Sequence, residues 1–261
     1  EIPISKVKNE FDAVFIGTGA PKGLPLAVEG EGLSGVIDGI RFLRAVNSSE
    51  KISMGKNVAV IGGGNTAVDC ARTAKRLGAE SVMLVYRRTR DEMPAANEEI
   101  DALIEEGIKI QYLTTPIHFY GENEKLQSME CIKMELGEAD SSGRRQPVPV
   151  KNSEFSIVVD IVITALGQAT QTSFAGEIGL SLAKNGTVLV DPLNGSTNVE
   201  GIFAGGDVST GPAYVVDAIA AGQRAAKSIS RFLRGEAVIT DNYEKIPEKL
   251  SVDEIDVVYG K

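Results

Sequence analysis

The sequence predicts an α/β protein in which buried parallel strands end in glycine-rich turns. Its 261 residues include 28 glycines, no tryptophan and only 5% aromatic residues, a composition typical of nucleotide-binding sheets with tight strand–helix turns. At about 150 residues per domain, this length corresponds to one large domain or two ordinary ones. With 43% hydrophobic and 24% charged residues, the chain is globular rather than disordered or coiled-coil.

Charge and cysteine content exclude several classes of function. Lys and Arg number 27 against 36 Asp and Glu, a formal net charge of −9, whereas nucleic acids and anionic membranes require a basic surface. Cys70 and Cys131 are far apart and form no CxxC pair, so we expect no iron–sulfur or other metal site in this chain. Because no apolar run of about 18 residues and no signal peptide occur, we expect a cytoplasmic protein.

The first half of the chain is predicted to alternate strands and helices. Apolar runs that stop at glycine or at polar turns predict buried strands at 11–16, 58–61, 81–86 and 108–113. Apolar residues at three- and four-residue spacing predict helices at 37–46, from Asn65 as N-cap to Gly78, and at 96–106.

Periodicity changes in the second half. Alternating residues at 117–120, 126–135 and 155–159 predict an antiparallel meander, with 137–151 as a charged loop. Further strands are expected at 161–165, 187–190 and 202–204, and a long amphipathic helix at about 213–233.

The strand at 58–61 is followed by the sequence Gly62-Gly63-Gly64-Asn65-Thr66-Ala67. This is GxGxxA between a strand and a helix, the context that indicates dinucleotide binding. Gly62 permits the tight turn, Gly64 lets backbone N–H groups reach a pyrophosphate, and Ala67 lets helix and strand pack closely. The helix N-terminus adds a partial positive charge. The alternative is a glycine-rich turn that holds no ligand.

The end of the next strand indicates which dinucleotide is bound. An acidic residue there would accept from the ribose 2′-hydroxyl of NAD, but this strand ends in Arg87 and Arg88. Arg87 lies 25 residues after Gly62, close to the usual offset of about 20. Because arginine pairs well with a 2′-phosphate, the sequence favours NADP(H) over NAD(H). The alternative is a solvated basic cluster.

A second pair of motifs lies outside this unit. Gly17-Thr18-Gly19-Ala20 follows the first strand, and Gly205-Gly206-Asp207 follows the strand at 202–204. Asp207 could accept hydrogen bonds from a polyhydroxyl chain, and the helix that follows could face a phosphate or an electron-rich ring. Alone, the Gly-Asp pair would be only a turn. Paired with the first motif, it indicates a second ligand site.

Together these motifs resemble the two-dinucleotide-binding flavoproteins, and within them the small (beta) subunit of NADPH-dependent glutamate synthase and its relatives. The resemblance covers residues 10–235, nearly the whole chain. It is carried by residues 12–20, 58–79, 86–89 with 93–95, 136–138 with 143–145, and 202–207.

The resemblance implies a Rossmann-like NAD(P)-binding domain inserted into a partial FAD-binding domain. The expected ranges are 1–50 and 166–235 for the two pieces of the FAD-binding domain, 51–165 for the NADP(H)-binding domain with its meander, and 236–261 for a tail. Gly62 to Ala67 would bind the NADPH pyrophosphate, Arg87 and Arg88 the 2′-phosphate, and Gly206 and Asp207 the ribityl chain of FAD. Thr18, Gly19 and Gly167 would lie where the chain crosses between domains.

The implied activity is hydride transfer between NADP(H) and FAD, which requires no catalytic acid or base. Electrons would continue through iron–sulfur clusters on a missing N-terminal segment or a partner subunit, such as a glutamate synthase large subunit. No first FAD-binding GxGxxG precedes Glu1, so this chain is expected to be a fragment that retains little FAD, is inactive alone and self-associates. The alternative function is a non-catalytic module that senses NADP(H) or docks a partner.

Overall fold

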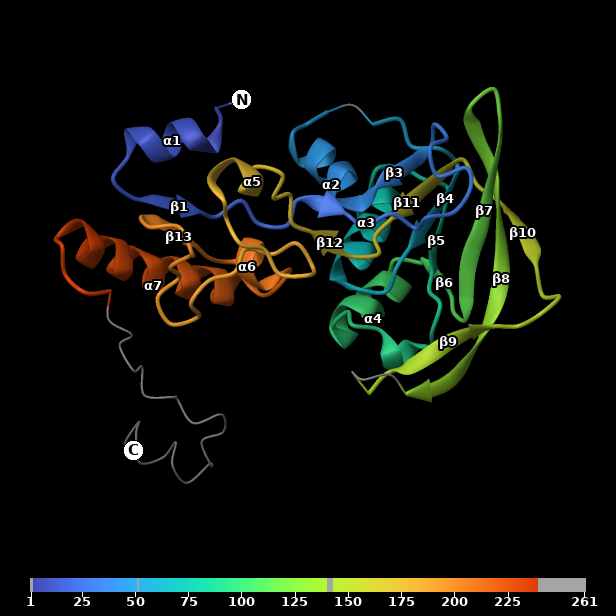
Figure 1. Ribbon diagram of the computed structural model, residues 1–261. Helices are drawn as coiled ribbons and strands as arrows, with labels where there is room; N and C mark the ends of the chain where they lie inside the picture. Colours follow the sequence, from blue (N-terminus) through green and yellow to red (C-terminus); the bar gives the residue numbers. More distant parts are fainter. Residues whose placement is uncertain (1, 51, 140–142, 239–261) are drawn as a thin grey trace, which may run out of the picture. The chain divides into compact units, whose positions relative to one another are not determined.

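The computed structural model describes residues 2–50, 52–139 and 143–238 (Figure 1). Their contacts define two compact units. Residues 21–169 form one, called here the inserted unit. Residues up to 20, together with those from 170 onward, form the other, called the flanking unit. The divisions fall at Ala20/Pro21 and Ala169/Thr170 rather than at the predicted residues 50 and 165.

A five-stranded parallel sheet forms the centre of the inserted unit. Its strand order is β3 (Val36–Asp38), β11 (Ile161–Thr164), β4 (Asn57–Ile61), β5 (Ser81–Val85) and β6 (Lys109–Gln111). All four residues of β11 are buried, as are four of the five in β4. Such uninterrupted burial is typical of parallel strands that are covered on both faces.

Helices cover one face of this sheet. They are α2 (Gly39–Asn47), α3 (Asn65–Arg76) and α4 (Asn97–Glu105). Phe42, Val68 and Leu103 from these helices pack with Val60 and Leu84 of the sheet in one buried core. The β4–α3–β5 unit predicted from the glycine turn is therefore present.

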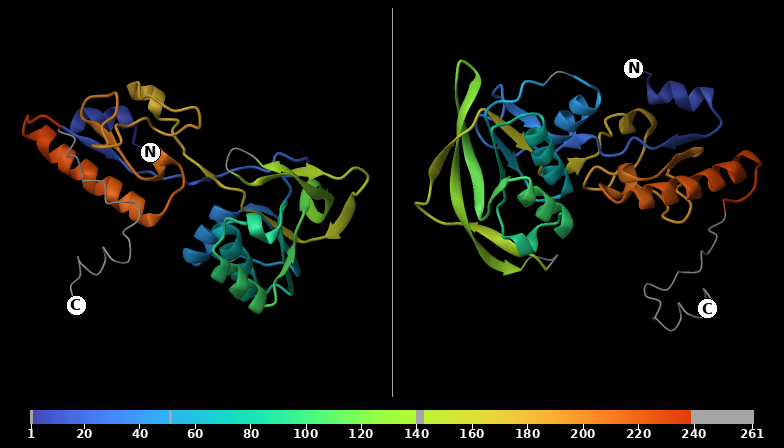
Figure 2. Two further views of the ribbon diagram at one scale, coloured as in Figure 1. Left: turned by 90° about the horizontal axis from the view of Figure 1, so that it is seen from below. Right: turned by 180° about the vertical axis from the view of Figure 1, so that it is seen from behind.

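An antiparallel meander covers the opposite face, as Figures 1 and 2 show. It consists of β7 (Thr114–Glu122), β8 (Lys125–Ala139) and β10 (Phe155–Val158), in the order β10-β8-β7. Phe119 and Met129 of the meander pack against Ala59, Ile61 and Val162 of the parallel sheet. The predicted meander is confirmed.

The predicted charged loop at 137–151 is wrong in part, because a further strand lies within it. β8 continues to Ala139, and β9 (Arg145–Pro149) pairs with it antiparallel, with Leu136 opposite Pro147. Four of the five β9 residues are exposed, so no apolar alternation marks the strand. Its two prolines are tolerated because β9 is an edge strand.

Residues 21–50, predicted as part of the first FAD-binding piece, belong to the inserted unit. β3 pairs with β11, and α2 packs against α3. β2 (Lys22–Gly23) pairs with β12 (Gln168–Ala169). These contacts divide the predicted range 1–50 between the two units.

Within the flanking unit, β1 (Val14–Ile16) and β13 (Ile202–Ala204) form a parallel pair. The helices of this unit are α1 (Ile4–Glu10), α5 (Ala175–Ile178), α6 (Asp207–Thr210) and α7 (Val215–Leu233). α1 was not predicted, and none of its residues is buried. The strand expected at 187–190 is reduced to one bridge between Val188 and Leu182.

Most of the expected tail, residues 239–261, lies outside the described residues. Across the part of the chain that the structure describes, no helix is both long enough and apolar enough to span a membrane.

Candidate functional site

In the turn after β4, contacts within the protein explain why the first glycine and Ala67 are small residues. Gly62 has φ +150°, and a Cβ added there would lie 2.3 Å from the Ala165 carbonyl oxygen and 3.1 Å from the Ala67 Cβ. Any side chain at Gly62 would therefore collide with backbone, and Ala67 itself is fully buried. This geometry agrees with the tight turn and the close helix packing expected from the sequence.

The next two glycines differ from each other. A Cβ on Gly63 would lie 2.4 Å from the Tyr86 ring, which covers the turn. A Cβ on Gly64 would meet only Pro94 Cγ, at an ordinary 3.8 Å. The protein itself thus has room for a side chain at Gly64. Glycine at this position leaves open the space in front of α3, where a ligand could approach the backbone.

The backbone donors at the start of α3 face that space. Within residues 52–139, no carbonyl or side-chain oxygen accepts a hydrogen bond from the N–H groups of Gly64, Asn65 and Thr66. Helix α3 has 12 residues, so its dipole adds partial positive charge at the same end. Unsatisfied N–H groups and a helix dipole together favour an anion such as a pyrophosphate.

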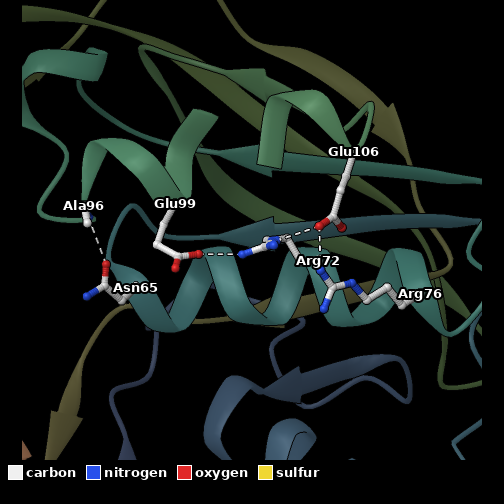
Figure 3. Close-up of polar contacts among 6 residues, drawn as sticks. All are labelled: Asn65, Arg72, Arg76, Ala96, Glu99 and Glu106. Carbon is white, nitrogen blue, oxygen red and sulfur yellow. Dashed lines mark hydrogen bonds and ion pairs between the residues drawn. The ribbon is translucent and has the colours of Figure 1, made fainter. Parts of the chain in front are cut away.

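Asn65 has a different structural role from the predicted one. The N-cap residue of α3 is Gly64, and no side chain makes a capping hydrogen bond to the start of this helix. Instead, Asn65 Oδ1 accepts a hydrogen bond from the Ala96 N–H, at 3.0 Å (Figure 3). Ala96 is the N-cap of α4. The side chain therefore joins the glycine turn to the start of the next helix.

Ion pairs connect the remainder of these two helices (Figure 3). Arg72 contacts Glu99 at 2.5 Å and Glu106 at 2.9 Å, and Arg76 contacts Glu106 at 2.6 Å. The hydrogen bond from Arg76 is the main reason why the pKa of Glu106 lies below its usual value. α4 is thereby fixed against α3.

The two predicted arginines lie in unlike surroundings. Arg87 is exposed, and no hydrogen bond or ion pair joins it to residues 2–50, 52–139 or 143–238. Arg88 is only 5% exposed, and its Nε donates to the Arg145 carbonyl at 2.7 Å. The structure therefore presents one guanidinium to solvent and packs the other against the start of β9.

Glu92, which the sequence interpretation missed, organises the segment after these arginines. The Thr89 hydroxyl and N–H both donate to Glu92 Oε2. Arg145 Nε and Nη2 donate to Glu92 Oε1, at 3.0 and 2.9 Å. The Thr89 hydroxyl is the largest cause of the lowered pKa of Glu92, and Arg145 contributes further. The Thr-x-x-Glu spacing, a capping-box pattern, was the available signal.

In the flanking unit, the parallel pairing of β1 and β13 brings the two predicted turns together. Gly19, Gly206 and Asp207 line the same open cavity of about 280 Å³. Thr18 is exposed and is not among its lining residues. Asp207 Oδ1 accepts from the Ala213 N–H at 3.3 Å. A second cavity, of about 470 Å³, shares Gly205 and Gly206 with it, so two open cavities adjoin in this unit.

Gly167 belongs to the inserted unit, close to its boundary. It has φ +136°, and its carbonyl accepts from the Leu24 N–H at 3.1 Å. The two divisions between units, at 20/21 and 169/170, lie within three residues of Thr18, Gly19 and Gly167 along the chain.

Both cysteines and the single histidine pack against neighbouring residues. Cys70 and Cys131 are unpaired and buried, and burial raises the pKa of each thiol to about 12. His118 stacks on Tyr120 with ring centroids 4.1 Å apart. In the described ranges, no three His, Cys, Asp or Glu side chains gather as a metal site would require.

Comparison with known proteins identifies the family. Residues 4–222 match the family described as pyridine nucleotide-disulphide oxidoreductase, and the chain belongs to it. The description of this family names its members as oxidoreductases that use a pyridine nucleotide. The predicted fold class, a Rossmann-like NAD(P)-binding domain inserted into a partial FAD-binding domain, is thereby confirmed.

Two relatives are informative. The chain is 43% identical to the NADP(+)-dependent formate dehydrogenase subunit beta of Moorella thermoacetica, over 100% of this chain and 38% of the relative. It is 34% identical to the glutamate synthase [NADPH] small chain of Azospirillum brasilense, over 90% of this chain and 51% of the relative. The predicted resemblance to the glutamate synthase small subunit is confirmed. The chain therefore spans only 38% and 51% of the lengths of these two relatives.

A solved structure supports the fold. FprA of Mycobacterium tuberculosis in complex with NADPH has a TM-score of 0.70 and 18% sequence identity, over 98% of this chain and 70% of that chain.

Proposed function

We propose that this chain supplies the NADP(H) site and part of the flavin site of an NADPH-dependent flavin oxidoreductase. When bound, the two cofactors supply the redox chemistry, in which a hydride passes from nicotinamide C4 to flavin N5. The residues of this chain bind and orient the cofactors and exclude water. None needs to act as an acid or base, so we propose no catalytic residue.

One observation carries the NADP(H) assignment: two sites for anions lie at neighbouring strand ends. The Gly62 N–H donates to the Val85 carbonyl at 3.0 Å, so the glycine turn and the end of β5 adjoin. The glycine turn carries the N–H groups of Gly64, Asn65 and Thr66. The end of β5 is followed by Arg87, whose side chain is exposed. This is the spatial relation of the pyrophosphate and the ribose 2′-phosphate in a Rossmann-type site.

Arg87 and Arg88 are proposed to hold the 2′-phosphate together. Arg87 is the exposed cation that reaches the phosphate, and Arg88 forms the packed base of the segment. No acidic side chain occupies positions 86–88 to receive a ribose hydroxyl. The names of both relatives specify NADP(H), in agreement with this choice.

For the flavin, we propose that Asp207 accepts hydrogen bonds from the ribityl chain and that Gly19 and Gly206 allow close approach. A Cβ on Gly19 would meet no atom within 4 Å, so the cavity there is open to a ligand. The four-residue helix α6 begins at Asp207. Thr18 and Gly167 are proposed to lie at the crossings between the cofactor domains.

Onward electron transfer is proposed to use iron–sulfur clusters on another segment or a partner subunit, such as a glutamate synthase large subunit. The relatives are named as a beta subunit and a small chain, names that belong to multi-subunit enzymes. Unpaired Cys70 and Cys131 fit the reducing cytoplasm that we propose as its compartment.

The test has two parts. Calorimetric titration of this chain should show tighter binding of NADPH than of NADH. The chain extended at its N-terminus and loaded with FAD should then oxidise NADPH with an artificial electron acceptor. Binding of neither nucleotide would refute the proposal, and binding without oxidation would favour a non-catalytic sensor.

A further inference from the structure

The start of β9 contacts the predicted 2′-phosphate segment with both its backbone and its side chain. The Arg145 carbonyl accepts from Arg88 Nε at 2.7 Å. The Arg145 guanidinium donates two hydrogen bonds to Glu92 Oε1, at 3.0 and 2.9 Å. One residue from the β8–β9 hairpin therefore contacts residues at both ends of the segment 88–92.

Contacts continue from Glu92 to the glycine turn. The Tyr86 hydroxyl donates to the Glu92 carbonyl at 2.6 Å, and the Tyr86 ring packs where a Gly63 side chain would be. The Ala95 N–H donates to the Gly63 carbonyl at 3.1 Å. The position of the arginine segment is thus coupled to that of the turn by a continuous set of contacts.

We propose that Arg145 and Glu92 are positioning residues that set the preference for a 2′-phosphorylated nucleotide. By this account, which rests on the proposed NADP(H) site, the hairpin β8–β9 holds segment 86–95 so that Arg87 meets the phosphate. Specificity for the cofactor then depends on an edge strand more than 50 residues away from Arg87 along the chain.

The ion pair is poorly suited to a purely stabilising role. The Arg145 side chain is 51% exposed, and exposed ion pairs contribute little to stability. Glu92, by contrast, is 8% exposed, and each of its carboxylate oxygens accepts hydrogen bonds. Its charge therefore has a defined position, and removing its partner should release segment 88–92 rather than unfold the domain.

The test compares two probes that differ only in the 2′-phosphate, 2′,5′-ADP and 5′-AMP. Both are titrated into the wild-type chain, into Arg145→Gln and into Glu92→Gln. We expect each variant to bind 2′,5′-ADP about tenfold more weakly, a change of about 1.4 kcal/mol, with 5′-AMP affinity changed less than about twofold. Arg145→Lys, which keeps the charge, should recover part of the affinity.

Glu106→Gln serves as the matched control, because it removes another ion-paired carboxylate at the far end of α4. Its ratio of affinities for the two probes should equal that of the wild type. The double variant Glu92→Gln/Arg145→Gln should lose no more affinity than either single variant, because the residues act as one pair.

The possible failures are distinguishable. Equal losses for both probes, an unchanged ratio in both single variants, or additive effects in the double variant would overturn the positioning role while leaving the NADP(H) site intact. Failure of the wild-type chain to bind either probe would overturn the proposed function and this inference with it. If Glu92→Gln lowers the melting temperature strongly, Arg145→Gln, on its half-exposed side chain, decides the outcome.

Discussion

The glycine-rich turns of the inserted and flanking units differ in the length of the helix that follows each turn and in the contacts that hold the turn in place. In the inserted unit, a 12-residue helix starts at the turn, and Asn65 and Tyr86 connect that turn to the neighbouring segment. In the flanking unit, the turn at Gly206 leads into the four-residue helix α6, beside open cavities. From this difference we propose that a glycine motif forms an anion site before the ligand binds only when contacts fix both its helix and its flanking loop.

The three glycines of the turn in the inserted unit differ in whether the protein itself requires them. Gly62 and Gly63 are required by neighbouring protein atoms, whereas Gly64 is not. The protein has room for a side chain at Gly64, which lies beside backbone N–H groups that have no acceptor among the described residues. We therefore expect a bound ligand, rather than the fold, to require glycine at this position.

The largest expected effect is at Gly64. Gly64→Val should weaken NADPH binding by more than about 100-fold, because the side chain would fill the space that the pyrophosphate needs. The fold should survive, since only Pro94 lies near the added Cβ. Calorimetry and circular dichroism measure the two effects. Gly32→Val, at another glycine with no atom within 4 Å of an added Cβ, is the control. Unchanged NADPH affinity in Gly64→Val would show that the turn is structural only.

Flavin content tests the other side of the comparison. We expect the purified chain to be colourless, with no absorption band at about 450 nm, because good sites bury about 70–90% of their ligand and the flanking-unit cavities are open. NADPH should still bind. A yellow chain with stoichiometric FAD would mean that the flanking site is as complete as the inserted one.

Arg87 should separate the two nicotinamide cofactors. Loss of one charge-assisted hydrogen bond costs about 1.5–3 kcal/mol, so Arg87→Ala should weaken NADPH binding by one to two powers of ten, with NADH binding little changed. Arg88→Ala should weaken NADPH binding and also lower thermal stability, because the Arg88 side chain is 5% exposed and the Arg145 carbonyl loses its donor. Equal losses of NADPH and NADH in Arg87→Ala titrations would remove Arg87 from the 2′-phosphate site.

The smallest effect is expected at Asn65. Asn65→Ala removes the hydrogen bond to the Ala96 N–H, worth about 1 kcal/mol, and should lower the melting temperature by about 3 °C. Asn65→Asp keeps an oxygen acceptor and serves as the control for stability. A melting temperature for Asn65→Ala equal to that of the wild type would show that the contact does not hold the turn.

The sequence predicted the core of the inserted unit well, for a physical reason. β4, α3 and β5 have strong apolar periodicity interrupted by glycines, so their ends fall within two residues of expectation. β9 and α1 were not predicted, because almost none of their residues is buried. Without buried positions, the sequence lacks the apolar periodicity on which such predictions depend. A two-residue pairing such as β2–β12 has too few residues to show any period.

For the site residues, too, the sequence predicted local features better than contacts between distant segments. Gly62 and Ala67 lie in the tight turn and close packing expected from the motif, although the contact that most restricts Gly62 is with the Ala165 carbonyl, which is distant along the chain. The N-cap predicted for Asn65 was wrong, since a tertiary acceptor–donor pair with Ala96 competes successfully for its side chain. Arg145 could not be found from spacing, because its contacts with Arg88 and Glu92 depend on the pairing of β8 with β9.

The most direct test of the central claim is a crystal structure of this chain with NADP⁺. The account predicts the pyrophosphate at the N–H groups of Gly64, Asn65 and Thr66, and the 2′-phosphate beside Arg87. Dinucleotide phosphates bound instead at Gly205–Asp207, or a 2′-phosphate that points away from Arg87 into solvent, would contradict it.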